Sequence, residues 1–137
     1  YTSLCSKNNK RYLVASLPQI LYIDDEFDLL DLAQSFCREE GLQVDVTDCA
    51  LKGLELFKNN HYKIIISDAR MPQMSGYDLL LTLKKDFNFQ GHFILVTGDD
   101  GLLDKSQLQH YDLVLQKPLS FVKLIDDLKE MLLNPKK

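Results

Sequence analysis

The sequence predicts an α/β fold in which five parallel strands form one doubly wound sheet with helices on both faces. Short apolar runs alternate along the chain with segments whose apolar residues recur at helical spacing, a pattern typical of a parallel sheet covered by crossover helices. One apolar run follows Lys63 and ends abruptly at Asp68, before a loop that contains Pro72 and Gly76. Such an unbroken run indicates a central strand that is buried on both faces.

The first half of the chain contains two predicted strand–helix units. Gln19–Ile23 is a short apolar strand, and Phe27–Glu40 carries apolar residues at helical spacing before Gly41, a natural helix stop. Gln43–Thr47 alternates valines with polar residues, as a strand with one covered face does. Asp48 can cap a second helix, which gathers on one face the apolar residues Ala50, Leu54 and Phe57.

The second half continues this alternation. Strands are predicted at 63–68, 92–96 and 113–115. A helix from about Gly76 to Asp86 follows the first of these strands, and a weak helix between Leu102 and Gln109 follows the second. Ser120 caps the last helix, whose apolar stripe comprises Phe121, Leu124, Ile125, Leu128, Met131 and Leu132. Because crossovers are right-handed, few topologies remain, and we expect the flavodoxin-like strand order 2-1-3-4-5.

The composition is that of an ordinary globular domain. Of 137 residues, 45% are apolar and 26% are charged, which suits one domain with a substantial core. The net charge of -4 argues against a nucleic-acid-binding surface. No apolar stretch approaches the roughly 20 residues that span a bilayer, and no signal-peptide pattern opens the chain. We therefore expect a cytoplasmic protein without membrane contact, with reduced thiols at Cys5, Cys37 and Cys49.

Composition also divides the chain into three segments. Residues 1–17 are polar and basic without an acidic side chain, which predicts a leader or linker; the alternative is an extra helix through Tyr12–Val14 that docks on the domain. The predicted domain occupies residues 18–134, and residues 135–137 form a short tail. Because the chain begins at Tyr1 rather than Met, we expect a fragment or a processed form.

Polar side chains follow four of the predicted strands at their carboxyl ends. Asp24-Asp25-Glu26 follows the first strand, Asp68 ends the third, Thr97 ends the fourth, and Lys117 comes shortly after the fifth. The carboxyl ends of parallel strands share one edge of the sheet, which is where open α/β sheets bind ligands. The sequence therefore predicts one pocket that contains acidic groups, a hydroxyl and an ammonium.

The chemistry of such a pocket is specific. Carboxylates that are brought together repel, so either their pKa values rise or a cation joins them. Oxygen ligands suit Mg²⁺, which is typically held by one or two carboxylates plus phosphate oxygens. An ion held by Asp25 and Asp68 would leave Asp68 an oxygen able to attack phosphorus. Lys117 and Thr97 would then stabilise the charge on the transferred phosphoryl group.

Each motif also has an ordinary structural explanation. Acidic residues before a helix usually cap it and complement its dipole. Asp68 can start a turn, Thr97 is a common strand-end residue, and Lys117-Pro118 is most often a turn. The functional interpretation depends on finding all of these motifs in order at one sheet edge.

Taken together, the motifs resemble those of the receiver domain of two-component response regulators. The resemblance covers roughly residues 19–133, with Asp-Asp after strand one, Asp-x-x-Met-Pro after strand three, Thr-Gly after strand four and Lys-Pro after strand five. It implies that Asp68 is the phosphoacceptor and that Asp24 and Asp25 are the acidic metal-binding pair. Arg70 would offer its backbone carbonyl to Mg²⁺, for which Mn²⁺ is a possible substitute.

The same resemblance implies further roles. Thr97 would be the switch hydroxyl that moves toward the phosphoryl group, and Lys117 would pair with the phosphoaspartate, with a Lys117-Pro118 bond that is commonly cis in the family. The phosphodonor would be a histidine kinase or a histidine phosphotransfer domain. The module would not be a conventional enzyme, since its chemistry is limited to its own phosphorylation and slow autodephosphorylation. The resemblance is compatible with the receiver of a hybrid histidine kinase.

The sequence departs from the family pattern in two places. Both lie on the face formed by the fourth helix, fifth strand and fifth helix, on which many receivers signal. An effector or a second copy would bind there. The family usually has an aromatic residue three positions before the lysine, whereas this chain has Val114, and Tyr111 does not align. The stretch from Thr97 to Lys117 is also about two residues short. We therefore expect intact phosphorylation chemistry and an altered readout. One hypothesis is that Arg70 and Asp99 pair across the site and hinder the attacking water, which would lengthen the phosphorylated lifetime; the alternative is that both are solvated loop residues.

Three other functions share parts of this fold or site. A phosphatase that forms a phosphoaspartate would need a second Asp two residues after the nucleophile, where this chain has Arg70. A receiver-like interaction module that acts without phosphate is less consistent with the full set of site residues, although Val114 favours it. A flavin-binding protein would need a phosphate-cradling loop after the first strand, where Asp24-Asp25-Glu26 would repel phosphate.

Overall fold

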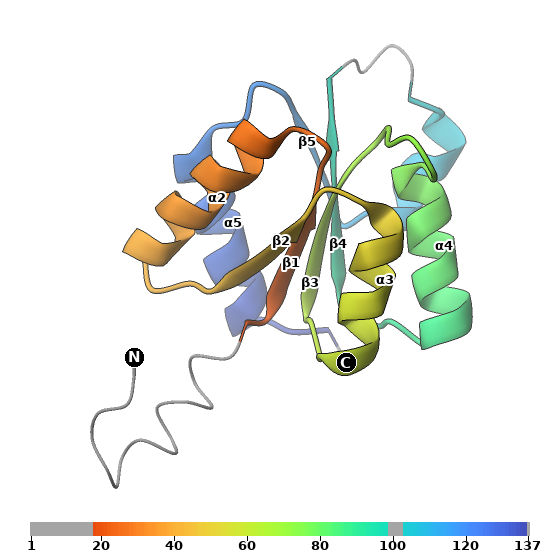
Figure 1. The fold of residues 1–137 in the computed structure, drawn as a ribbon, viewed down its shortest axis with the longest axis horizontal. Helices are drawn as coiled ribbons and strands as arrows, with labels where there is room; N and C mark the ends of the chain where they lie inside the picture. Colours follow the sequence, from red (N-terminus) through yellow and green to blue (C-terminus); the bar gives the residue numbers. More distant parts are fainter. Residues whose placement is uncertain (1–17, 99–102, 137) are drawn as a thin grey trace, which may run out of the picture.

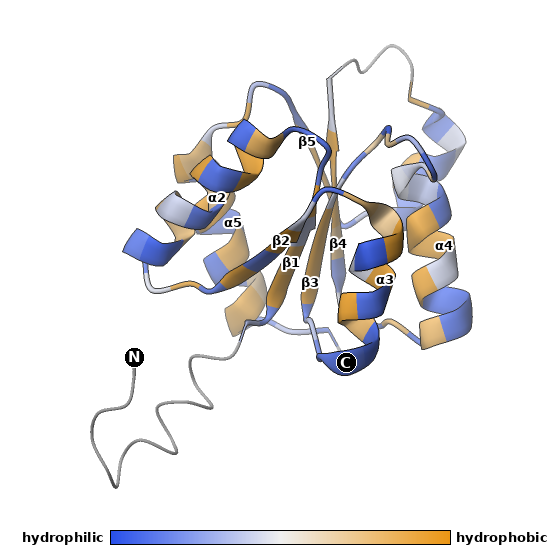
Figure 2. Cartoon of the chain, in the orientation of Figure 1, coloured by the Kyte–Doolittle hydropathy of each residue, from blue (hydrophilic) through white to orange (hydrophobic). Residues whose placement is uncertain are grey.

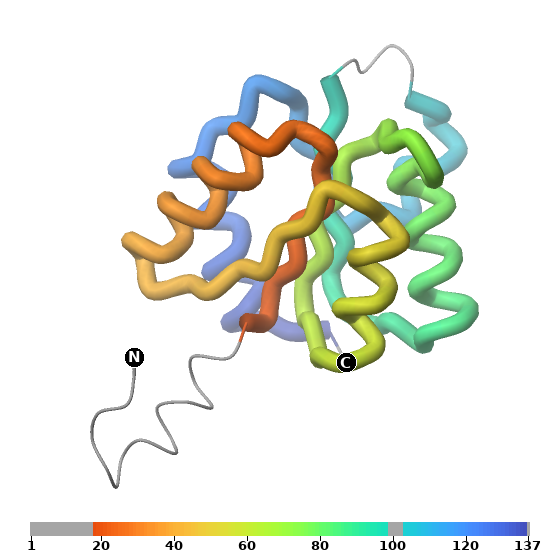
Figure 3. The backbone as a smooth tube through the Cα atoms, in the orientation of Figure 1, coloured from red at the N-terminus to blue at the C-terminus, as the bar shows by residue number. Residues whose placement is uncertain are grey.

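The computed structural model describes residues 18–98 and 103–136 and has the predicted α/β architecture (Figure 1). One sheet of five parallel strands has the order β2-β1-β3-β4-β5, as predicted. The strands are β1 (Ile20–Ile23), β2 (Val44–Thr47), β3 (Ile64–Asp68), β4 (His92–Thr97) and β5 (Leu113–Gln116). All four pairings are parallel, so every strand leaves the sheet at the same edge, as the chain path in Figure 3 shows.

Within the described part of the chain, four α-helices cover the two faces of the sheet. On one face lie α2 (Phe27–Glu39) and α5 (Phe121–Leu133), and on the other lie α3 (Ala50–Asn59) and α4 (Gly76–Phe87) (Figure 1). A short 3₁₀ helix, η2 (Lys105–His110), connects β4 to β5. Within the described residues, no helix has the length and apolar character needed to cross a membrane.

The strand sequences explain the two core layers. Successive side chains of a strand point to opposite faces of the sheet, so an apolar strand supplies both layers. In β1, Ile20 and Tyr22 pack on the α2–α5 side, whereas Leu21 and Ile23 pack on the α3–α4 side. All four are at most 1% exposed, and the strands are the most apolar part of Figure 2. Two covered faces therefore hold the central strands, and the polar edge with them, in fixed positions.

Most predicted element boundaries agree with the structure. Gly41 has a left-handed φ of 79° two residues after α2, which fits its expected role as a helix stop. Ser120 caps α5 by accepting a hydrogen bond from the Lys123 amide, as predicted. The predicted cap of α3 was wrong: the capping position falls on Cys49 and no side-chain cap is formed there. The helix begins one residue too late for Asp48, which instead pairs with Lys52 at 3.6 Å.

The weak helix predicted between Leu102 and Gln109 is replaced by the six-residue η2. The Asp104 side chain accepts a hydrogen bond from the Ser106 amide at 2.9 Å, and no residue of η2 is buried. A segment without a buried face gains little from packing, so the short connection forms about two turns of 3₁₀ helix instead of an α-helix. Residues 1–17, with the alternative helix through Tyr12–Val14, lie outside the described residues.

Gly76 fixes the approach of α4 to the end of β3. A Cβ atom at this position would lie 2.7 Å from the Asp68 carbonyl oxygen and 2.7 Å from Leu95 Cδ1. We expect Gly76→Ala to lower the free energy of unfolding by about 2 kcal/mol in urea denaturation, because the contacted carbonyl belongs to a central strand and cannot move cheaply. Gly98→Ala is the control, since a Cβ atom there would have no neighbour within 4 Å. Equal stability of both variants would contradict this close contact.

Candidate functional site

Four strand ends bring the predicted site residues to one edge of the sheet. Asp24 directly follows β1, Asp68 and Thr97 are the last residues of β3 and β4, and Lys117 directly follows β5. Backbone hydrogen bonds continue the sheet beyond its strands, from the Ala69 amide to the Val96 carbonyl at 2.8 Å and from the Lys117 amide to the Thr97 carbonyl at 2.8 Å. The site is therefore built on the rigid sheet, and the predicted convergence is confirmed.

Three carboxylates form an acidic group. One oxygen each of Asp24, Asp25 and Asp68 lies within 4.8 Å of the other two. Asp24 is fully buried and Asp68 is 7% exposed, whereas Asp25 is exposed to solvent. The group thus has two deep carboxylates and one at the surface, which leaves a route from solvent to the buried pair.

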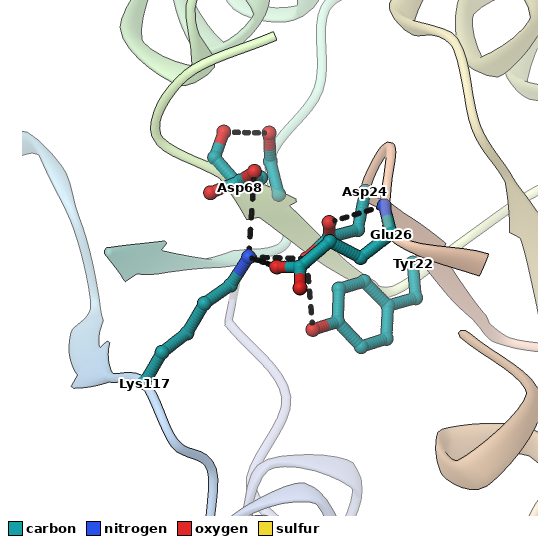
Figure 4. Close-up of polar contacts among 6 residues, drawn as sticks. Tyr22, Asp24, Glu26, Asp68 and Lys117 are labelled. Carbon is teal, nitrogen blue, oxygen red and sulfur yellow. Dashed lines mark hydrogen bonds and ion pairs between the residues drawn. The ribbon is translucent and has the colours of Figure 1, made fainter. Parts of the chain in front are cut away.

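The Lys117 ammonium lies between the carboxylates of Asp68 and Asp24 (Figure 4). Its Nζ lies 3.2 Å from Asp24 Oδ2 and 3.5 Å from Asp68 Oδ2, and it also contacts Glu26. The Lys117–Pro118 peptide bond is cis, as the family resemblance implied. One ammonium is thereby shared by three carboxylates that would otherwise repel one another.

Fixed donors orient the Asp24 carboxylate. The Glu26 amide donates to Asp24 Oδ1 at 2.9 Å, and the Tyr22 hydroxyl donates to Asp24 Oδ2 at 3.4 Å (Figure 4). The Asp24 amide itself donates to the Thr47 carbonyl of β2 at 3.1 Å. Both the backbone and the side chain of this aspartate are therefore held in place.

Burial sets the electrostatics of the site. Burial first and the neighbouring Asp24 second raise the pKa of Asp68, and because Lys117 partly offsets both effects, the pKa is about 6. Burial also raises the pKa of Asp24, against the hydrogen bond from Glu26 and the charge of Lys117. For Lys117, burial disfavours the ammonium, but Glu26, Asp24 and Asp68 together outweigh this and raise its pKa to about 12. At neutral pH the site is an ionised lysine among crowded carboxylates.

The pKa of Tyr22 is also raised, first by burial and then by the charges of Asp24 and Asp68. The phenol therefore keeps its proton at neutral pH and acts as a hydrogen-bond donor.

The donor set of the acidic group suits a hard divalent cation. It consists only of carboxylate oxygens, one of them solvent-exposed, and Mg²⁺ prefers one or two carboxylates together with water or phosphate oxygens. The charge of Lys117 lowers the pKa of both Asp24 and Asp68, but burial keeps both pKa values above their ordinary range. A cation at this position would relieve the remaining repulsion.

A cleft extends from Asp68 along the space between α4 and η2. Arg70, Thr97, Tyr77 and Tyr111 are among the residues that line it. Thr97 is only 4% exposed, so the floor of the cleft is closed by the end of β4. Asp68 and Lys117 both line the cleft, which therefore gives a reactant access to the two side chains.

The structure brings together all the site residues predicted from the sequence. Arg70 lies in the loop after β3, whereas Asp99, its predicted partner, lies outside the described residues. Sequence reasoning missed the contact of Glu26 with Lys117 and the bond from Tyr22 to Asp24. The available signals were that Glu26 extends the acidic run and that Tyr22 is the only polar residue of β1.

A parallel sheet of order 2-1-3-4-5 with this polar carboxyl edge is the architecture of CheY-like signalling domains. The chain belongs to the response regulator receiver domain family, whose model matches residues 20–129. It is therefore a receiver domain of the two-component signalling class.

Three relatives illustrate the similarity. The response regulator SaeR of Staphylococcus epidermidis is 36% identical over 82 residues, which are 60% of this chain and 35% of SaeR, so the match spans about a third of that relative. A CheY-like receiver domain from Methanospirillum hungatei has a TM-score of 0.75 and 28% identity, covering 83% of this chain and 92% of the other. The response regulator TrrA from Thermotoga maritima, solved in complex with Mg²⁺-BeF, has a TM-score of 0.74 and 24% identity, covering 84% and 99%.

The raised pKa of Asp68 predicts a pH-dependent cost in the metal-free protein. The folded state binds the Asp68 proton more tightly than the unfolded state does, so protonation of Asp68 favours folding. This advantage is lost as the pH rises from 3.8 to about 6, and above that range the buried carboxylate lowers the stability. Asp68→Asn removes the charge, so we expect the metal-free variant to be more stable than wild type by about 1–2 kcal/mol at pH 7.5 and by much less near pH 4. Urea denaturation in EDTA measures this difference.

Asp31→Asn, at an exposed position of α2, is the matched control and should change stability little at either pH. A destabilised Asp68→Asn at pH 7.5 would show that the contact with Lys117 outweighs the cost of burying the carboxylate.

Proposed function

We propose that the chain is a phosphorylation-controlled signalling receiver that accepts a phosphoryl group on Asp68 in a Mg²⁺-dependent reaction. The observation that carries this proposal is the contact of Lys117 with Asp68 beside the acidic group, at the end of a central strand. It combines a candidate nucleophile, an ammonium group and a set of candidate metal ligands within one pocket. The phosphodonor would be a phosphohistidine on a histidine kinase or a phosphotransfer domain.

Asp68 is the nucleophile in this mechanism. Its carboxylate, mostly ionised at pH 7, attacks phosphorus from the cleft. A new oxygen–phosphorus bond forms while the phosphorus–nitrogen bond to the donor imidazole breaks, and the imidazole takes the electron pair and a proton. Lys117 stabilises the charge on the phosphoryl oxygens, and the Thr97 hydroxyl donates to one of them. The aspartyl phosphate is the product.

Asp24, Asp25 and Asp68 would hold the divalent cation, with the Arg70 backbone carbonyl as a further ligand. Bound there, Mg²⁺ would offset the carboxylate charge and that of the incoming phosphoryl group. Mn²⁺ has the same preference for oxygen ligands and is a plausible substitute. The Mg²⁺-BeF complex of TrrA supports this assignment, because it joins the same cation to a mimic of a phosphoryl group on a similar fold.

Phosphorylation of Asp68 would serve to pass on a signal and not to convert a substrate repeatedly. The domain would undergo only its own phosphorylation and slow autodephosphorylation, as a cytoplasmic module that occupies residues 18–134. The leader 1–17 and the tail 135–137 would then connect it to other parts of a longer protein, for example a hybrid kinase. An effector or a second copy would bind the face formed by η2, β5 and α5.

An interaction module that works without phosphate is the second candidate. Val114, which is partly buried against the core layer under α3 and α4, stands in place of an aromatic residue and keeps this candidate open. A phosphatase has less support, because Arg70 occupies the position at which it would need an acid or base. The two leading candidates differ in whether Asp68 takes up a phosphoryl group.

Phosphoryl uptake tests the leading candidate directly. Incubation with acetyl phosphate and Mg²⁺ should add the mass of one phosphoryl group to the intact protein, and hydroxylamine should remove it, because acyl phosphates react with this nucleophile. Asp68→Asn should take up none, whereas Asp31→Asn should behave as wild type. Uptake that persists in Asp68→Asn, or is absent from the wild type at saturating Mg²⁺, would contradict the proposal.

Lys117→Met separates phosphoryl transfer from metal binding. We expect the rate of phosphorylation by acetyl phosphate to fall by about 100-fold, because a cation that stabilises the transferring group is lost. Mg²⁺ affinity should be retained or increased, since the ammonium no longer competes for Asp24 and Asp68. Lys123→Met, which removes an exposed lysine paired only with Asp127 in α5, is the control. An unchanged phosphorylation rate would remove Lys117 from the mechanism.

A further inference from the structure

Tyr22 lies directly beneath the acidic group. It is fully buried in β1 and points to the core layer under α2 and α5, where most of its neighbours are aliphatic. A buried hydroxyl without a hydrogen bond is unfavourable, because it loses its contact with water and gains no partner. The Tyr22 hydroxyl donates to Asp24 Oδ2 at 3.4 Å, so the polar tip of a core residue contacts a candidate metal ligand (Figure 4).

The donors around Asp24 differ in how firmly they are fixed. The Glu26 amide belongs to the backbone at the start of α2, and the Tyr22 ring is locked by the core. Lys117, by contrast, has a flexible side chain that is 19% exposed and is shared with other carboxylates. When a cation enters the acidic group, Lys117 can move away, whereas the contacts from Glu26 and Tyr22 remain.

We propose that Tyr22 is a positioning residue for the divalent cation, whose hydroxyl holds the Asp24 carboxylate in the orientation that faces Asp25 and Asp68. This inference rests on the metal site of the proposed function and adds a residue that acts through Asp24. Hydrogen bonds from outside the ligand shell fix the orientation of ligating groups, and their loss typically weakens metal affinity by about 10- to 100-fold. The 3.4 Å separation places Tyr22 at the weaker end of that range.

A purely structural role for Tyr22 makes a different prediction. If Asp24 merely satisfies a buried phenol, removing the hydroxyl changes stability alone. Tyr62 provides a matched comparison, because it is 4% exposed and its hydroxyl also donates to a carboxylate, that of Asp45. Asp45 lies within β2 and is not part of the acidic group. Phenylalanine at either position keeps the ring and its packing.

The experiment measures Mg²⁺ affinity by isothermal titration calorimetry on the unphosphorylated full chain. Tyr22→Phe should weaken Mg²⁺ binding by about tenfold, whereas Tyr62→Phe should leave it within about twofold of wild type. In an Asp24→Asn background, Tyr22→Phe should cause no further loss, because its effect passes through the Asp24 carboxylate. Urea denaturation of each variant without metal records the change in stability separately.

Tyrosine fluorescence gives a second readout, since the chain has six tyrosines and no tryptophan. Mg²⁺ should change the tyrosine emission of wild type and of Tyr62→Phe, and this change should be absent from Tyr22→Phe.

Three results would overturn the role of Tyr22: an Mg²⁺ affinity of Tyr22→Phe equal to that of wild type, an equal loss in Tyr62→Phe, or a full further loss in the Asp24→Asn background. These measurements need no phosphodonor. If the wild type takes up no phosphoryl group but Tyr22→Phe still binds Mg²⁺ more weakly than the wild type, the proposed function is overturned and the positioning role is supported.

Discussion

The repulsion among carboxylates at the sheet edge, held in check by one lysine, is the interaction on which the rest of the site depends. Asp24 and Asp68 are buried close together, and Lys117 contacts both. The single ammonium does not return the pKa of Asp68 to its ordinary value, because burial, followed by the charge of Asp24, keeps it at about 6. The site is consequently poised to gain from a further positive charge, and binding a divalent cation is the simplest way to supply it.

The apolar core stabilises the fold enough to offset the cost of this cluster of carboxylates, and it fixes the strands that carry them. Ile20, Ile64 and their neighbours fill one core layer, and a second layer fills the other face of the sheet. Burial of each such side chain contributes about 1.5–3 kcal/mol, so many of them offset the cost of one crowded acidic edge. Stability is placed in the body of the sheet and reactivity at its end.

Two aromatic residues, Tyr77 and Tyr111, are among those that line the cleft next to Asp68. The ring of Tyr111 lies 6.3 Å from that of Tyr77 in α4 and 6.0 Å from that of Phe93 in β4. Val114, where the family usually has an aromatic, packs in the same layer. Together with the short η2, this gives the face on which many receivers signal a different make-up here from the one that the family resemblance implies, while the acidic edge keeps the expected residues.

The sequence by itself determined the α/β class, the strand order and the convergence of Asp24, Asp68, Thr97 and Lys117, because strand periodicity and parallel topology place every strand's carboxyl end at one edge. Helix boundaries near Asp48 and the 3₁₀ form of η2 were not predictable, since they depend on hydrogen bonds and burial that local patterns do not encode. Only the tertiary structure decided that Tyr22 reaches Asp24 and that Glu26 shares Lys117. The Glu26–Lys117 contact joins residues far apart in the sequence, and the Tyr22–Asp24 bond, although only two residues long, depends on how the core holds the tyrosine ring.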